Sequence, residues 1–386
     1  MAMDAPALER EKTAGQKPGI VDCDVHPTIA TGLNALFPYM PDAWRRRFER
    51  KGAGALPVGL TLRFAHPNGA VVREDARNEA GAVGGSDPAF LARDLIDAHG
   101  IETVVLNSLQ TGALCAAFAS IDESIVIASA ANDYFIEEWL PHDARFTYAA
   151  VVPSQDPAAG AQEIRRIGAN PQVSAIALPP IATLLGNRYF HPIYEAAQEF
   201  DLPIFLHVTG TDSIYHSAPM SAGGLPDTYV ERYVTLSQAA EANLNSLIFN
   251  GTFEKFPRLK VLFVEYGFVW PIATMLRMDR LWRGLRHEVP WVRKSPIDYV
   301  ADHVWFATQP NEEPRNPEDL ERLVQMVGVG NLCFSTDYPH WDNDMPMHSL
   351  RAQKEEDRDR IMRTNALEVL LLSHRDGTDE QRPPPR

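Results

Sequence analysis

Short runs of β-branched and aromatic residues alternate along the chain with longer segments in which apolar residues recur about every 3.6 positions. This alternation is typical of stacked βα units. It predicts eight strands, at 20–25, 103–107, 146–152, 173–178, 203–208, 260–265, 303–307 and 331–336. It predicts helices between and after them, at 116–139, 157–168, 191–200, 228–247, 268–287, 317–327 and 348–371.

Eight strands, most of them followed by a helix, favour an α/β fold of the (β/α)8 (TIM) barrel type over an open sheet. A doubly wound sheet stays an alternative, but it would usually carry a glycine-rich phosphate loop early in the chain. The sequence contains no GxGxxG, GxxxxGK[ST] or GxSxG motif.

Two segments interrupt this pattern, and we interpret them as inserted loops after strands 1 and 5. Residues 27–95 are rich in Pro, Gly and Arg, and in a barrel such an insertion is usually a lid or an oligomer contact. The second segment, "VTGTDSIYHSAPMSAGGLPDT", follows the fifth strand. We therefore expect a homo-oligomer, specifically a dimer. The predicted organisation is a flexible N-terminal extension (1–18), a single barrel domain (19–372) with 27–95 as its insertion or lid, and a disordered tail (373–386).

Composition limits the setting and the partners. The 36 basic and 51 acidic residues give a net charge of −15, which argues against nucleic-acid and anionic-membrane partners. The first 18 residues lack the apolar core of a signal peptide, and no apolar run approaches the ~18 residues of a membrane span. The three cysteines are far apart and suit reduced thiols. We expect a cytoplasmic protein that acts on a small molecule.

The first predicted strand carries an unusual set of polar residues. In "GIVDCDVHPT" (19–28), Asp22, Asp24 and His26 occupy alternate positions, so their side chains share one face of the strand. Burying three ionisable groups on one face is costly unless something pairs with them. Two explanations for these residues stay open: an edge strand with one solvent-exposed face, which is the ordinary case, or a metal or catalytic site.

Further ionisable residues stand at the ends of later strands. His207 ends the fifth, Glu265 the sixth and Asp337 the eighth, with His340 three residues farther on. In a barrel these ends meet at the catalytic face. Each residue also has an ordinary explanation: a satisfied loop histidine, a glutamate paired with an arginine at the rim, or an aspartate in a turn before proline. Their coincidence on one predicted face favours a shared divalent ion, and mixed imidazole and carboxylate ligands suit Zn²⁺, Fe²⁺ or Mn²⁺.

Several longer motifs give the chain a resemblance to a known family. They are "VDCDVHP" at 21–27, "RYFHPIYEAAQEFDLPIFLHVTG" at 188–210, "FEKFPRLKVLFVEYGFVWP" at 253–271, "VGNLCFSTDYPHWD" at 329–342 and "RIMRTNALEVLLL" at 360–372. The chain resembles the amidohydrolase superfamily, in particular the branch with aminocarboxymuconate-semialdehyde decarboxylase and related metal-dependent hydrolases. The family usually has an HxH pair on strand 1, a histidine on strand 5, often a histidine on strand 6, and an aspartate on strand 8.

The resemblance implies a ligand set, namely Asp24, His26, His207 and Asp337. Two residues depart from the family pattern: Asp24 replaces the first histidine of the pair, and Glu265 stands where the strand-6 histidine often lies. No lysine occurs between Lys51 and Lys255, which excludes the carboxylated-lysine bridge of binuclear members. We therefore expect one divalent ion per chain (Zn, Fe or Mn). Asp22 or Glu265 remains available for a second ion or as a supporting residue.

A bound divalent ion lowers the pKa of a coordinated water, and Glu265 or Asp337 could then accept a proton from that water. We therefore expect a metal-dependent hydrolase of a small ester, amide or related substrate. Two observations favour hydrolysis: the extra carboxylate at 265, and the lack of Lys or Arg within the strand-end motifs. The alternative is a nonoxidative decarboxylase of an aromatic or unsaturated acid, and a third possibility is a catalytically silent binding barrel. The candidate substrate-pocket residues are His216, Tyr266, His340 and Trp341.

Overall fold

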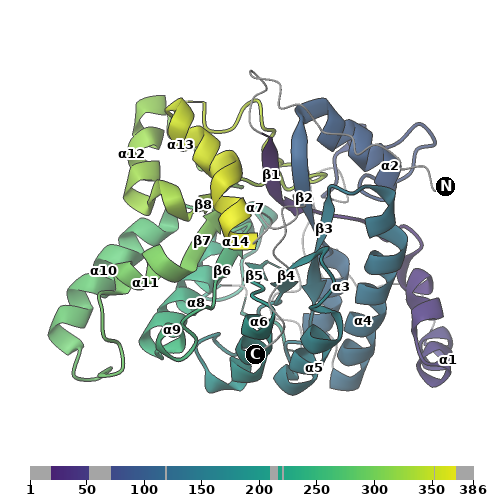
Figure 1. Ribbon diagram of the computed structural model, residues 1–386, viewed down its shortest axis with the longest axis horizontal. Coiled ribbons are helices and arrows are strands. Elements are labelled where there is room, and N and C mark those ends of the chain that lie inside the picture. The colour runs from purple at the N-terminus through teal and green to yellow at the C-terminus, as the bar shows by residue number, and fades with distance from the viewer. Residues whose placement is uncertain are drawn as a thin grey trace, which may run out of the picture.

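A barrel of eight parallel strands forms the centre of the molecule in this computed structural model (Figure 1). The structure describes residues 19–51, 71–117, 120–208, 216–219, 221–351 and 353–370. Each strand pairs in parallel with the next one along the chain. The strands are β1 (Ile20–Val25), β2 (Ile101–Asn107), β3 (Phe146–Val151), β4 (Val173–Ala177), β5 (Ile204–His207), β6 (Val261–Val264), β7 (Val304–Ala307) and β8 (Leu332–Cys333).

The chain beyond β8 returns to β1 and closes the barrel. The backbone N–H of Cys23 donates to Phe334 O (3.0 Å), and the N–H of His26 donates to Tyr338 O (2.7 Å). Figure 1 shows the helices arranged around the outside of the strands. The predicted (β/α)8 barrel is therefore confirmed, and the doubly wound open sheet is excluded.

The strands are apolar along most of their length because both of their faces are covered. Every position of β3 and β4 is buried, and Val104, Val105 and Leu106 of β2 have no exposed surface. One face of each strand fills the barrel interior and the other packs under the helices, so polar residues need not alternate with apolar ones. The polar residues within and beyond β1 are therefore exceptions that need partners.

Helix α5 begins where the sequence provides capping residues. The Asp156 side chain accepts hydrogen bonds from the N–H groups of Ala158 (3.1 Å) and Ala159 (3.0 Å), and Pro157 is the first helical residue of α5.

No helix in the described part of the chain is long and apolar enough to cross a membrane. The α-helices are α1 (Asp42–Arg50), α2 (Pro88–Leu91), α3 (Leu109–Ala117), α4 (Ile121–Tyr134), α5 (Pro157–Ile167), α6 (His191–Glu199), α7 (Tyr229–Val234), α8 (Ser237–Phe249), α9 (Thr252–Lys255), α10 (Trp270–Leu285), α11 (Pro296–His303), α12 (Pro317–Val327), α13 (Glu355–Asp359) and α14 (Asn365–Leu370). The short 3-10 and π-helical segments are η1 (Gly32–Tyr39), η4 (Glu74–Ala76), η5 (Ala92–Asp97), η6 (Phe135–Trp139), η7 (Leu140–His142), η8 (Arg188–Phe190), η9 (Val329–Asn331) and η10 (Arg360–Thr364).

Some helix boundaries differ from the prediction. The last helical segment begins at Glu355 rather than at 348, because Leu350 adopts a left-handed backbone (φ 56°) that a helix does not accommodate. The predicted helix 228–247 is divided into α7 and α8. At this break the Thr235 hydroxyl donates to Arg232 O (2.8 Å), a side-chain bond that competes with helix continuation.

The predicted insertions are described only in part. In 27–95, α1 lies against α4, where Arg47 and Lys51 both contact the Glu123 carboxylate. Residues 52–70 of this segment lie outside the described residues, as do 209–215 and 220 of the second segment. The extension 1–18 and the tail 373–386 also lie outside them. The lid, the oligomer contact and the domain limits stay predictions.

Asp22 links the first strand to the end of the last one. Its Oδ1 accepts hydrogen bonds from the N–H groups of Asp24 (3.1 Å) and Thr336 (3.0 Å), and its Oδ2 accepts one from the Thr336 hydroxyl (2.6 Å). Burial raises the pKa of Asp22 to about 7, although the bonds from Thr336 partly offset this effect. The cost of burying this carboxyl group is therefore countered by bonds that hold the barrel closed.

Replacing Asp22 with alanine is expected to destabilise the protein, because three buried donors lose their acceptor. We expect the free energy of unfolding to fall by about 2 to 4 kcal/mol, measured as a lower urea midpoint. Asp22→Asn keeps an acceptor oxygen for the two backbone donors and should lose less. An unchanged midpoint in the alanine variant would contradict this structural role.

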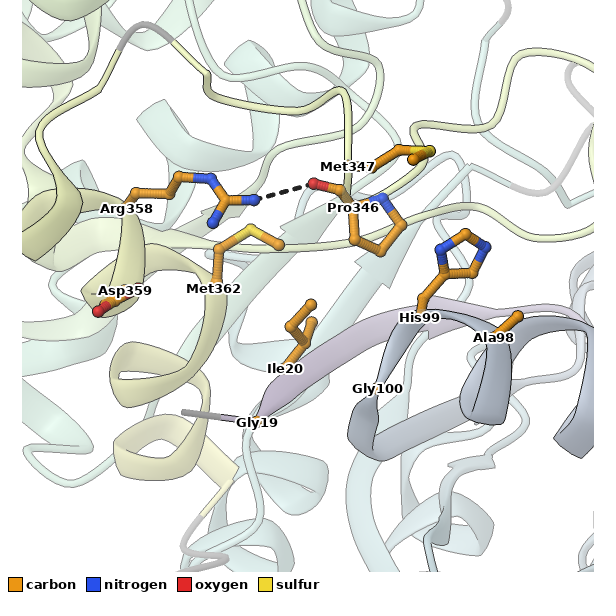
Figure 2. Close-up of a pocket in the computed structure, with 10 residues that line it drawn as sticks. All are labelled: Gly19, Ile20, Ala98, His99, Gly100, Pro346, Met347, Arg358, Asp359 and Met362. Carbon is orange, nitrogen blue, oxygen red and sulfur yellow. Dashed lines mark hydrogen bonds between the residues drawn. The ribbon is translucent and has the colours of Figure 1, made fainter. Parts of the chain in front are cut away.

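A cavity of about 460 Å³ lies beside the start of β1, and Figure 2 shows its lining residues. Gly19 and Ile20 border it on one side, and Arg358 and Met362 on the other. The Arg358 guanidinium donates to Pro346 O (2.9 Å) and so joins the chain after β8 to α13. The lining residues include none of the predicted metal ligands, which lie at the C-terminal ends of the strands, whereas this cavity lies beside the N-terminal end of β1.

Candidate metal centre

The predicted ligands gather at the C-terminal ends of the strands, as a barrel requires. Asp24 and His26 come from the end of β1, His207 ends β5, Glu265 follows β6, and Asp337 follows β8. All five side chains are buried. Residues from four distant places in the sequence therefore share one small, buried region.

The two strand-end histidines point the same ring nitrogen at one carboxylate. His26 Nε2 lies 3.3 Å from Asp24 Oδ2, and His207 Nε2 lies 3.2 Å from the same oxygen. The Nδ1 atoms contact backbone carbonyls, that of His26 meeting Asn107 O at 2.8 Å and that of His207 meeting Val208 O. A histidine that donates from Nδ1 to a carbonyl presents the lone pair of Nε2, the usual arrangement for a metal ligand.

Asp337 completes the centre from the β8 side. Its Oδ1 lies 2.8 Å from His26 Nε2 and 2.6 Å from His340 Nδ1. Its Oδ2 accepts a hydrogen bond from Gln309 Nε2 (3.1 Å). The His340 ring stacks on that of His26, with the ring centroids 4.4 Å apart.

These side chains suit a divalent cation. The ligand atoms of Asp24, His26 and His207 lie within 4.8 Å of one another, and so do those of His26, Glu265, Asp337 and His340. His26 Nε2 and Glu265 Oε2 are buried and make no well-aligned hydrogen bond among the described residues, although each lies within ion-pair distance of another side chain of the cluster. A buried, converging set of carboxylate oxygens and imidazole nitrogens fits Mn²⁺, Fe²⁺ or Zn²⁺.

The charges in the centre shift the pKa values of its carboxyl groups in opposite directions. Burial alone would raise the pKa of Asp24, but the charges of His26 and His207 outweigh burial and lower it. The pKa of Asp337 is also lowered, because His340 and His26 outweigh burial. The pKa of Glu265 is raised well above its ordinary value, first by burial and then by the charges of Asp337 and Asp342. The ionised form is therefore favoured at the two aspartates, and the protonated form at Glu265.

Two of these carboxylates stand on unusual backbone. Glu265 has φ 60° and Asp337 has φ 62°, both in the left-handed region that favours glycine. Such conformations cost free energy and persist at functional sites where the surroundings enforce them. The chain turns sharply after β6 and β8, and these turns place both carboxyl groups over the end of the barrel.

The remaining predicted site residues occupy different places. Asp22 bonds to Thr336 and is not among the grouped ligand atoms of the described residues. His340, predicted for the substrate pocket, lies in the metal cluster, and Trp341 next to it is 39% exposed. Tyr266 is buried, with its ring 6.3 Å from that of Phe263. His216 lies at the edge of an undescribed segment, where its carbonyl accepts a bond from Ala182 N–H (2.8 Å).

The structure adds four residues that the sequence analysis did not single out. Asn107 ends β2 and donates from Nδ2 to Asp24 Oδ1 (3.1 Å), and Gln309 follows β7 and holds Asp337. Tyr233 on α7 and Asp342 contact each other near Glu265. A sequence signal for the two amides exists, because Asn107 is the last residue of its strand and Gln309 follows the end of its strand by two residues. Neither side chain is ionisable, so neither belongs to the set of ionisable strand-end residues.

Comparisons with known proteins bear on the chemistry. The chain is 28% identical over 304 residues to gamma-resorcylate decarboxylase of Rhizobium radiobacter, covering 73% of this chain and 86% of the relative. It is 23% identical to 2-amino-3-carboxymuconate-6-semialdehyde decarboxylase of Dictyostelium discoideum, covering 73% and 75% of the two chains. The predicted hydrolase activity is contradicted by these relatives, which are decarboxylases. The extra carboxylate at Glu265 does not by itself indicate hydrolysis, because a carboxyl group can give a proton as well as take one.

A solved structure shares the fold. It is a dihydroxybenzoic acid decarboxylase from Polaromonas sp. JS666 with bound manganese and the inhibitor 2-nitroresorcinol. It has a TM-score of 0.63 and 20% sequence identity, and it covers 92% of this chain and 98% of that one. Residues 21–372 match the family described as Amidohydrolase, a span that includes seven strands in full, all of β1 but its first residue, and every predicted ligand. The chain therefore belongs to the amidohydrolase family.

Proposed function

We propose that this protein is a metal-dependent, nonoxidative decarboxylase of a hydroxylated aromatic carboxylic acid. The observation that carries the proposal is the match to gamma-resorcylate decarboxylase over 86% of that enzyme's length. The buried cluster supports it, because it supplies a candidate cation site and, in Glu265, a buried carboxyl group whose Oε2 makes no well-aligned hydrogen bond among the described residues. The alternative activity of the sequence analysis thus becomes the main proposal.

Asp24, His26, His207 and Asp337 would hold one divalent ion, and we propose Mn²⁺, which the Polaromonas decarboxylase structure contains. When bound, such an ion supplies Lewis-acid chemistry that orients a chelating carboxylate or hydroxyl group. Asn107 fixes Asp24, and Gln309 with His340 fixes Asp337. These residues hold the ligands in place before the substrate arrives, which limits reorganisation during the reaction.

Decarboxylation breaks the bond between the ring carbon and the carboxyl carbon, and CO2 leaves. The electron pair stays on the ring carbon, which then takes a proton. We assign delivery of this proton to Glu265, because its Oε2 is buried beside the proposed ligand His207 (3.3 Å from Nε2) and is not engaged in a well-aligned hydrogen bond among the described residues. Solvent then restores the proton on Glu265. The rings of Tyr233 and Trp341, 6.2 Å apart, provide an apolar surface beside this carboxyl group.

Metal removal and product analysis test this proposal. Protein treated with a chelator should lose turnover of 2,6-dihydroxybenzoate and related hydroxybenzoates, and added Mn²⁺ should restore it. In ¹⁸O-labelled water the wild type should release CO2 in equal amount to the organic product, with no label in that product. Two results would overturn the proposal: no turnover of any aromatic acid by the metal-loaded protein, or labelled product formed from esters or amides.

A further inference from the structure

Tyr233 connects two acidic side chains beside the metal centre. This half-buried tyrosine lies on α7, and its hydroxyl is within hydrogen-bond distance of Glu265 Oε1 (3.3 Å) and of Asp342 Oδ2. The other oxygen of Glu265, Oε2, lies 3.3 Å from His207 Nε2. The two oxygens of one carboxyl group are therefore used differently. Oε1 contacts Tyr233, and Oε2 faces the metal ligands.

Asp342 is itself held from the metal side. Gln309 Nε2 donates to Asp342 Oδ2 (3.2 Å) and also to Asp337 Oδ2 (3.1 Å). A continuous chain of hydrogen-bonding contacts thus runs from Asp337 through Gln309, Asp342 and Tyr233 to Glu265. It joins the two carboxylates that stand on left-handed backbone.

The ring of Tyr233 is also fixed. It stacks on the Tyr229 ring with the centroids 5.7 Å apart and an interplanar angle of 25°. The Trp341 ring lies 6.2 Å away, and the backbone N–H of Trp341 donates to Val71 O (2.7 Å). Aromatic contacts of this kind restrict the ring, so the hydroxyl occupies a defined position.

We propose that Tyr233 is a positioning residue for Glu265. Its hydroxyl holds Oε1 and so turns Oε2 toward the metal centre and the substrate carbon. The expected effect of Tyr233 on turnover rests on the proposed decarboxylase function. The expected effect of Tyr233 on the position of Glu265 rests only on the contacts described above.

The test compares Tyr233→Phe with a matched control, Tyr194→Phe. Both variants remove one hydroxyl group and keep the ring. Tyr194 is buried on α6, and its hydroxyl donates to Leu185 O (2.7 Å), outside the metal centre. In Mn²⁺-loaded protein we expect kcat to fall about 10- to 100-fold in Tyr233→Phe, with KM and Mn²⁺ content little changed. The control should keep the wild-type kcat.

A double variant separates positioning from general damage. Because Tyr233 acts through Glu265, Tyr233→Phe should cost almost nothing further in a Glu265→Gln background. Additive losses in the double variant, or a kcat in Tyr233→Phe equal to that of the control, would overturn the inference. Asp342→Asn is a second variant of the same chain of contacts, and it should lower kcat in the same direction.

An electron paramagnetic resonance spectrum of bound Mn²⁺ serves as a readout that needs no substrate. Both Tyr233→Phe and Glu265→Gln alter the surroundings of the ion at Glu265, so both should shift the Mn²⁺ spectrum from that of the wild type in the same direction. Tyr194→Phe should give the wild-type spectrum. If the wild type turns over no aromatic acid, the proposed function fails, but the spectra still decide the role of Tyr233. Identical spectra for Tyr233→Phe and the wild type would overturn it.

Discussion

Replacement of His207 with alanine is expected to remove the bound divalent ion and the decarboxylase activity together. Its Nε2 lies 3.2 Å from Asp24 Oδ2 and 3.3 Å from Glu265 Oε2, at the centre of the ligand group. Loss of a ligating imidazole should weaken Mn²⁺ binding by more than the roughly 10- to 100-fold that removal of an outer partner costs. Metal analysis of the purified variant and its kcat measure both effects.

His303→Ala is the matched control for this experiment. His303 is also buried, and its Nδ1 also contacts a backbone carbonyl, that of Leu259 (3.0 Å), but it lies on α11 outside the metal centre. The control should keep its ion even if its stability falls. Full metal occupancy and full activity in His207→Ala would show that His207 is not a ligand.

Glu265→Gln is expected to keep the ion and lose most of the turnover. The amide retains the shape of the side chain and can still contact Tyr233, but it cannot deliver a proton to carbon. Removing general acid–base assistance typically lowers the rate by ~10²–10⁴-fold. The measurements are kcat for a hydroxybenzoate substrate and Mn²⁺ content.

The control for Glu265 is Glu163→Gln. Glu163 is a buried glutamate on α5 that pairs with Asn132 and Arg166, away from the metal centre, and its replacement should leave kcat unchanged. If Glu265→Gln loses its ion along with its activity, Glu265 is a ligand and a second ion becomes the better interpretation. Normal kcat in this variant would remove Glu265 from the mechanism.

The barrel was predictable because its strands carry a strong signal. Runs such as "TVVLN" and "PIFLHV" are buried on both sides, so eight apolar stretches separated by helical periodicity specify the order of the elements. The start of the last helical segment was less predictable. Leu350 is apolar and fits a helical pattern, but its left-handed backbone prevents a helix at that position. That conformation depends on tertiary packing, which periodicity does not report.

The grouping of the site was predictable for the same reason. Asp24, His26, His207 and Asp337 lie at or just beyond the C-terminal ends of strands, and a closed barrel brings those ends together. Tyr233 was not predictable, because it lies in an ordinary amphipathic helix and reaches the site only through the packing of α7. The reaction was predicted wrongly. The residue types around an ion do not determine whether a carboxyl group takes a proton from water or gives one to carbon.

The left-handed backbone at Glu265 and Asp337 has a consequence for laboratory evolution. Glycine at either position would relieve the conformational cost (φ 60° and 62°), but it would delete a carboxyl group to which the proposed mechanism assigns a role. Stability and activity are therefore opposed at these two positions. Selection for thermal stability alone favours replacement of Glu265 and Asp337, whereas selection for turnover retains both residues. A screen for a more thermostable enzyme should therefore keep these two codons fixed and mutate other positions.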